Sequence, residues 1–228
     1  MADEERRINI NGIETNLKKE ILVKLFEFAG VEASEELKDL VVKWIDPATD
    51  HPEGTERIFK NSNLKTPEEL LVILEYFYYI EQRMTKEEAQ AEAKRVYNKV
   101  NDFITVYGGK SVNINTASLD VLKITITAVG ADSNIQATST EIQDLVSKID
   151  NYRKGNVEHY FTISDMNANE IKRKLGLGLK GEINNQTRII DKLVSNQLLA
   201  AISENFRIES KGKIGNTIKN ITAIYDRG

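Results

Sequence analysis

The chain has 228 residues, enough for one large domain or two small ones. Its 40% hydrophobic and 29% charged residues are typical of a globular protein rather than a disordered one. With 31 basic against 35 acidic residues the formal net charge is −4, so only a local basic patch could bind nucleic acid. The lack of cysteine excludes disulfides, thiolate metal sites and a cysteine nucleophile.

The first residues are charged, from Asp3 to Arg7, and run directly into a β-prone segment. No signal peptide precedes Asp3, and no apolar run approaches the length of a membrane span. We therefore expect that an upstream segment precedes this chain in the natural protein.

A short asparagine motif occurs twice, as Ile-Asn-Ile-Asn at residues 8–11 and as Val-Asn-Ile-Asn at residues 112–115. Each copy alternates β-prone residues with asparagines that can bond their own backbone, and an apolar-periodic segment follows. After the second copy, Thr116 is the predicted N-cap of a helix and Leu119 the first residue of its apolar face. One copy alone would be an ordinary helix start, but the pair predicts a duplicated helical unit with a short extended entry.

Apolar residues at helical spacing predict that most of the first half is helical. The segment from residue 46 to residue 63 interrupts this pattern with Asp, Pro, Gly and Asn, so it is predicted to be a loop. The helix after it begins where Thr66 can cap it, with proline at the first position and glutamate at the third. The predicted helices cover residues 17–29, 35–45, 66–77 and 85–101, and a β-prone run covers residues 103–107.

The second half is predicted to continue with helices. One follows the second asparagine motif, another covers residues 141–153, and residues 164–166 cap a short third one. The glycines of residues 175–181 predict a flexible connection rather than a phosphate-binding loop, because no strand-turn-helix surrounds them. The polar residues 184–186 are predicted to be mobile.

Two β-prone runs close the chain, at residues 206–209 and 218–224, and are predicted to pair as a hairpin through residues 211–216. Helical periodicity also predicts the core. The residues expected to be buried in the helical units are Leu17, Ile21, Leu25, Leu40, Trp44, Leu70, Leu74, Leu119, Leu122, Leu145 and Ile149.

Few residues of the chain are suited to catalysis. The two histidines, His51 and His159, lie in unrelated contexts, and no Gly-x-Ser-x-Gly or Walker-type motif is present. A carboxylate-only enzyme is compatible with the sequence, but nothing favours one. The sequence therefore predicts a protein that is not an enzyme.

An acidic loop is the most specific candidate site. Four carboxylates fall between residues 46 and 56, around two prolines and a glycine. Calcium takes six to eight oxygen ligands, which carboxylates and backbone carbonyls of a folded loop can supply, although the spacing is not that of an EF-hand. We predict that Asp46, Asp50 and Glu56 bind calcium. Glu53 is a weaker candidate, His51 is a poor ligand for so hard a cation, and the alternative is a solvated acidic loop.

Several stretches also occur in an order that one known family shares. They are an acidic lead into I-N-x-N at residues 3–11, W-x-D…G-T-E at residues 44–56, N-x-x-x-x-x-E-L at residues 63–70, T-V…N-x-N-T-A across residues 105–117, and closing strands after residues 203–206. Together they resemble the K-type minor pseudopilin of bacterial type II (general) secretion. The third and fourth stretches are the most specific, because they occur together and in order.

This resemblance implies an α+β, mainly helical fold: two helix-hairpin-helix (SAM-like) units inserted in a truncated pilin-like antiparallel sheet. The first unit, with the acidic loop and the charged helix, would span residues 1–111, and the second residues 112–202. Residues 203–228 would be the hairpin of the sheet.

The resemblance also implies a function. The protein would be a structural subunit that caps the tip of the pseudopilus at the periplasmic face of the bacterial inner membrane, anchored by an N-terminal helix that is not in this sequence. The I- and J-type minor pseudopilins would be its partners, and secreted protein cargo is a further candidate.

The Asn-Ile-Asn-Thr-Ala-Ser motif is also similar to helix-hairpin-helix proteins of DNA uptake. Those continue with a Pro-Gly-Ile-Gly-type hairpin that contacts phosphate, whereas this chain has Thr-Ala-Val-Gly-Ala at residues 127–131. A helix-hairpin-helix DNA-binding module is therefore the alternative function, and the acidic balance makes nucleic acid the less favoured partner.

Overall fold

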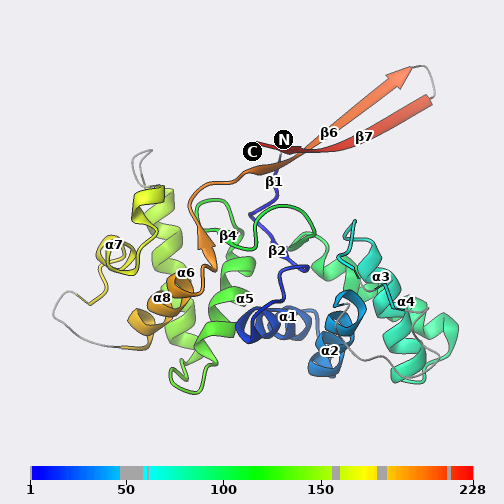
Figure 1. The fold of residues 1–228 in the computed structure, drawn as a ribbon, viewed down its shortest axis with the longest axis horizontal. Helices are drawn as coiled ribbons and strands as arrows, with labels where there is room; N and C mark the ends of the chain where they lie inside the picture. The colour runs from blue at the N-terminus through cyan, green and yellow to red at the C-terminus, as the bar shows by residue number, and fades with distance from the viewer. Residues whose placement is uncertain are drawn as a thin grey trace.

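The computed structural model describes residues 2–46, 59–60, 62–155, 160–178, 184–214 and 217–227. The protein belongs to the α+β class, as the sequence predicts, with a helical body and strands that are short except in a terminal hairpin. Figure 1 shows two groups of helices side by side, with the hairpin projecting from between them. Both marked ends of the chain lie at the base of the hairpin.

The first helical group lies between strands β2 (Ile8–Asn9) and β3 (Ile104–Thr105). Its helix starts follow from local sequence. The Thr15 side chain accepts a hydrogen bond from the backbone of Lys18, and Thr85 forms a capping box with Glu88. The helices of this group are α1 (Asn16–Phe28), α2 (Ser34–Ile45), α3 (Glu69–Tyr76), the π-helix η1 (Phe77–Glu81) and α4 (Lys86–Val100).

The second helical group lies between strands β4 (Val112–Asn113) and β5 (Leu199–Ala200). Thr138 and Glu141 form a capping box here, at the start of its longest helix. The helices of this group are α5 (Leu119–Gly130), α6 (Ser139–Lys154), the 3₁₀-helix η2 (Ile163–Asp165), α7 (Ala168–Lys174) and α8 (Asn185–Ser195).

Each group is closed by a two-stranded parallel sheet, β2 with β3 and β4 with β5. The first residue and the third residue of each asparagine motif donate their N–H groups across it. The bonds are Ile8 to the carbonyl of Phe103 (2.8 Å), Ile10 to Thr105 (3.0 Å), Val112 to Leu198 (2.9 Å) and Ile114 to Ala200 (2.9 Å).

The asparagines of the first motif bind backbone groups of distant segments. The Asn9 carboxamide oxygen accepts a hydrogen bond from the N–H of Asn11 at 2.9 Å. The Asn11 side chain accepts from the N–H of Leu64 at 2.9 Å and donates to the carbonyls of Leu64 (2.9 Å) and Val106 (3.3 Å). The Asn11 side chain thus binds both the segment that leads into α3 and the residue that follows β3, and it holds them at the start of the group.

The second motif repeats these bonds. Asn113 accepts from the N–H of Asn115 at 2.9 Å. Asn115 accepts from the N–H of Phe161 at 2.9 Å and donates to the carbonyls of Phe161 and Ala201, both at 2.8 Å. The two sequence copies therefore play the same geometric role.

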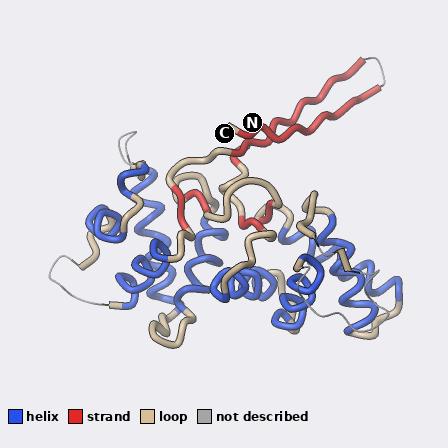
Figure 2. Tube along the Cα trace, in the orientation of Figure 1, coloured by secondary structure: helices blue, strands red, loops and turns tan. Residues whose placement is uncertain are grey.

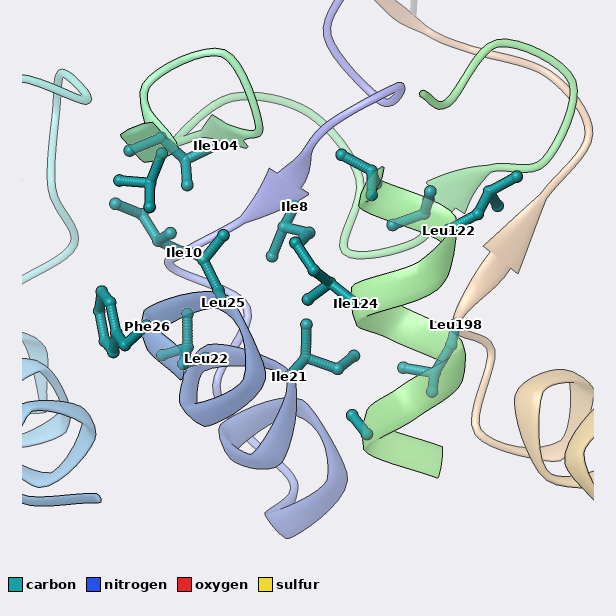
Figure 3. Close-up of a cluster of buried hydrophobic side chains, with 14 of the residues drawn as sticks. Ile8, Ile10, Ile21, Leu22, Leu25, Phe26, Ile104, Leu122, Ile124 and Leu198 are labelled. Atoms are coloured by element: carbon teal, nitrogen blue, oxygen red, sulfur yellow. The ribbon is translucent and has the colours of Figure 1, made fainter. Parts of the chain in front are cut away.

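One continuous core joins the two groups. It forms where α1 packs against α5. Figure 3 shows Ile21 and Leu25 of α1 facing Ile124 of α5, with Ile8 of β2 above them. All four side chains are 5% exposed or less, so the apolar faces of the first helix in each group bury one another.

The third sheet joins the two ends of the chain. β1 (Ala2–Asp3) pairs antiparallel with the base of β6 (Asn205–Ile214), and β6 pairs along its full length with β7 (Thr217–Asp226). Figure 2 shows the β6–β7 hairpin extending well beyond the helices. The predicted terminal hairpin is confirmed, with strands longer than expected.

Most of the predicted core is buried, with two exceptions. Leu17 is only partly buried, although it packs against the core, and Leu119 is 42% exposed. The cap explains Leu119: Ser118, not Thr116, caps α5, so Leu119 is its first residue and faces out. The Thr116 hydroxyl instead donates to the carboxylate of Asp3.

The prediction that residues 184–186 are mobile is wrong. Asn184 is the N-cap of α8 and accepts from the N–H of Thr187 at 3.0 Å. Ile189, Ile190 and Leu193 of this helix are fully buried. The polar residues are therefore a helix start, which the sequence analysis did not predict.

Candidate functional site

A buried cluster of charges lies where the three sheets meet. We call it the charged junction, made of Glu4, Glu5, Arg7 and Arg207. The Glu4 carboxylate is fully buried and lies 2.9 Å from Nε of Arg207 and 3.4 Å from Nη1 of Arg7. The Thr105 hydroxyl donates to it at 2.5 Å. Glu4 therefore links the start of the chain to both β3 and β6.

The two arginines of the junction share this carboxylate. Burial lowers the pKa of Arg7, and the neighbouring Arg207 lowers it further, while Glu4 raises it. Removing one partner of a buried pair leaves an uncompensated charge, at a typical cost of about 3–5 kcal/mol. Loss of Glu4 or Arg7, the two buried partners, is therefore expected to destabilise the junction.

Glu5 binds the segment between the two groups. Its carboxylate accepts from the N–H of Gly109 at 3.2 Å and from the backbone and side chain of Asn205 at 3.2 and 3.0 Å, while its carbonyl accepts from the N–H of Asn113 at 2.7 Å. Gly108 has φ +78°, and a Cβ there would clash with Oε1 of Glu5. Only glycine fits so close to this carboxylate.

The junction fixes the direction of the hairpin relative to the helices. Its hydrogen bonds reach β3, β4, the glycine turn and β6 from one short segment at the start of the chain. A second contact acts beside it, because Asn113 donates to the Ser203 hydroxyl at 2.7 Å, just before β6. The hairpin is therefore anchored to both helical groups at its base.

The end of α2 leads into the predicted calcium loop. Trp44 is 7% exposed, and its ring centroid lies 5.5 Å from that of Phe59 and 5.7 Å from that of Tyr76, both edge-on. The predicted burial of Trp44 is thus confirmed. Because Trp44 precedes the acidic segment and Phe59 follows it, this aromatic cluster holds the two flanks of the segment together.

Asp46 is the one predicted calcium ligand that the structure describes. It caps the C-terminus of α2, where its N–H donates to the carbonyl of Val42 at 2.9 Å, and it is half-buried. Asp50 and Glu56 lie outside the described residues, as do the weaker candidates Glu53 and His51. Among described residues, no three His, Cys, Asp or Glu side chains gather as a metal site would need.

Carboxylate oxygens at Asp46, Asp50 and Glu56 would suit calcium chemically. Such a site would also need the two ends of the acidic segment to lie close together, and the aromatic cluster brings its two flanks, Trp44 and Phe59, into contact. Beside it, the ammonium of Lys60 pairs with Glu69, and hydrogen bonds from this lysine and from the backbone of Lys65 outweigh burial and lower the pKa of Glu69. Lys60 and Glu69, which lie beside the loop, are thus paired with each other.

An open groove of about 800 Å³ lies between α8 and the turn after α5. The charged side chains that line this groove bind other groups of the same protein. Lys192 pairs with Asp132, and Arg188 donates to the carbonyl of Asn134 at 3.1 Å. The groove therefore offers little to hold a charged ligand.

Across the part of the chain that the structure describes, no helix is both long and apolar enough to cross a membrane. The chain matches none of the known family models, and no curated protein is significantly similar to it.

Sequence reasoning missed the charged junction. Glu4 and Arg7 belong to a run of charges, which in sequence is typical of a solvated segment, and Arg207 is far away along the chain. The available signal was Gly108-Gly109 before the second asparagine motif, because a glycine pair often allows a close backbone approach. The partner of that approach, Glu5, could not be read from sequence.

Proposed function

We propose that this chain is the periplasmic region of a K-type minor pseudopilin, a non-enzymatic subunit that caps the type II secretion pseudopilus. One observation carries the proposal. The first strand, β1, pairs with β6 of the terminal hairpin, and both helical groups are inserted between these two strands. A helical region inserted in a small antiparallel sheet is what the sequence resemblance implies.

The repeated asparagine geometry supports the proposed division of the chain. We assign residues 1–111 and 112–202 to two SAM-like helical units and residues 203–228 to the pilin-like hairpin. In support, Asn11 and Asn115 make matching bonds, one in each proposed unit. The charged junction, with Glu4 and Glu5, lies where the three parts meet.

The shape suits a cap. The helical groups spread to both sides of the hairpin base (Figure 1), so their bulk would prevent another subunit from stacking above. On the hairpin, Ile208, Ile221 and Tyr225 share one face and are 41%, 57% and 53% exposed. We propose that a membrane-anchoring helix, preceding β1 in the whole protein, packs on this face.

In this proposal the protein sits at the periplasmic face of the bacterial inner membrane and assembles with the I- and J-type minor pseudopilins. Its helical body would be available to secreted cargo. Calcium bound by Asp46, Asp50 and Glu56 would stabilise the loop that follows Trp44.

One observation bears on the alternative, a helix-hairpin-helix DNA-binding module. The turn after α5, which would have to approach phosphate, carries Asp132. A carboxylate at that place repels phosphate, although its pairing with Lys192 reduces the repulsion. The acidic turn favours the pseudopilin function.

The two functions can be separated by one comparison. We expect this chain, mixed with soluble I- and J-type domains at tens of micromolar, to elute as one complex from size exclusion, which requires an interaction of roughly −6 to −7 kcal/mol. The alternative predicts a salt-dependent gel shift with duplex DNA and separate elution of the three proteins.

A further inference from the structure

The hairpin presents one strand edge along its whole length. Among the described residues the sheet order is β1-β6-β7, so β6 has neighbours on both sides at its base, whereas β7 has β6 on one side only. Figure 2 shows the hairpin standing clear of the helices, so no helix of the body covers this edge.

The register shows which backbone groups point outward. The N–H of Arg227 donates to Glu204 at 2.8 Å, which makes this a hydrogen-bonded pair. In an antiparallel ladder such pairs alternate with non-bonded ones. Glu209 and Thr222 lie directly opposite each other, five positions from Glu204 and Arg227, so they form a non-bonded pair. Their N–H groups therefore point away from each other, to opposite edges of the hairpin.

The two strands differ in how they protect their edges. Charged side chains, lysine above all, discourage strand addition. β6 carries Arg207, Glu209, Lys211 and Lys213, whereas β7 has Lys219 as its one charge before the final Asp226. β7 is also rich in β-branched residues, so its edge is the less protected one.

The two faces of the hairpin differ in chemistry. On β7, Lys219, Ile221 and Tyr225 lie on one face, and Ile218, Thr222 and Ile224 lie on the other. Lys219 is exposed, as are Lys211 and Lys213 of β6, so the hairpin is basic toward its tip on a protein whose net charge is −4. A strand added beside β7 would therefore gain from acidic side chains beside Lys219 on the first face and from apolar ones beside Ile218 and Ile224 on the second.

We propose that β7 pairs through its open edge with an extended segment of another protein, one in which apolar and acidic residues alternate. Backbone hydrogen bonds would supply the affinity, and the two faces the selectivity. This edge would function in the same way whether or not the chain caps a pseudopilus.

The test uses a synthetic probe and two matched variants of the full chain. The probe is a fluorescein-labelled peptide of roughly ten residues, the length of β7, in which valine and glutamate alternate. Thr222→Pro removes an outward N–H of β7, and Glu209→Pro removes an outward N–H at the same level of β6; neither breaks a bond between the strands.

Fluorescence anisotropy should show saturable binding of the peptide to the natural chain. Thr222→Pro should weaken it at least about tenfold, and Glu209→Pro should leave it within about twofold. A peptide with lysine for glutamate, or one N-methylated on alternate amides, should bind at least about tenfold more weakly, and neither needs a protein variant to fold.

The proposal is overturned by no saturable binding, by equal losses in the two proline variants, or by equal binding of the N-methylated peptide. Sedimentation provides a further check. Dimers of the natural chain that Thr222→Pro dissociates would show that a second copy, not another protein, occupies the edge.

Discussion

Asn11 and Asn115 hold equivalent places in the two helical groups, and each side chain binds backbone groups of two segments that are distant in sequence. Asn115 lies in the second group, where its bonds to Phe161 and Ala201 are 2.8–2.9 Å long. A single amide thus closes each helical unit.

Asn115→Ala should lower the free energy of unfolding by about 2–3 kcal/mol, because it leaves buried backbone groups of Phe161 and Ala201 without partners. Asn115→Asp should cost more at neutral pH, since a carboxylate would face two carbonyl oxygens. Urea unfolding measures both. The exposed Asn151→Ala is the control and should change stability by no more than about 0.5 kcal/mol. A cost for Asn115→Ala as small as that of the control would refute this role.

The glycine turn allows a matched comparison. Gly108→Ala should destabilise the protein by about 2 kcal/mol or more, because φ is +78° and the new methyl group would meet Glu5. At Gly109 a Cβ would lie 3.9 Å from the nearest atom of Glu5, so Gly109→Ala should be tolerated. Hydrogen exchange at the amide of Asn205 should accelerate only in Gly108→Ala. Equal effects of the two substitutions would contradict the close approach of Glu5.

Asp165 should make the stability of the protein depend on pH in the acid range. Burial alone would raise its pKa, but hydrogen bonds from Lys174 and Thr162 outweigh burial and lower the pKa to about 2. The stabilisation is fully present above the unfolded pKa, near 4, and is lost as the pH falls toward 2, for a total of about 2 kcal/mol.

Asp165→Asn should therefore flatten the stability profile between pH 4 and 2, roughly the interval between the two pKa values. Urea unfolding across this range measures the effect. Glu204→Gln, at an exposed position, should keep the slope of the natural chain. A profile for Asp165→Asn as steep as that of the natural chain would contradict the assignment.

Calcium should raise the melting temperature after prior chelation, because it would bind only the folded loop. The stabilisation is about 2.7 kcal/mol at a hundredfold excess over Kd. Asp46→Ala should abolish the shift without unfolding the protein, whereas Asp39→Asn, on the exposed face of the same helix, should retain it. An unchanged melting curve at millimolar calcium would leave a solvated acidic loop as the explanation.

Sequence periodicity and capping predicted most helices, the terminal hairpin and the short extended entry at each asparagine motif, because these depend on neighbours along the chain. The bonds of Asn11 and Asn115 to distant segments were not predicted. α8 was missed although Asn184 could cap it and Ile189, Ile190 and Leu193 have helical spacing. Its first turn is polar and glycines precede it, so these residues were predicted to be mobile rather than helical.

The charged junction could not be predicted, for a different reason. Glu4 is buried only because Thr105 and Arg207 come to it from remote parts of the chain. Two-residue strands such as β1 have no periodicity of their own, so their pairing depends on the folded body. Of the predicted calcium site, only Asp46 is within the described residues, and that site stays a prediction.

The central claim is that this chain caps an assembly. The most direct measurement is the mass, by native mass spectrometry, of the complex formed with soluble I- and J-type minor pseudopilin domains of the same organism. We predict a complex that contains a single copy of this chain and does not grow when more is added. Three proteins that stay separate at tens of micromolar, roughly the regime of a −6 to −7 kcal/mol interaction, would contradict the account. So would a complex that keeps adding copies of this chain.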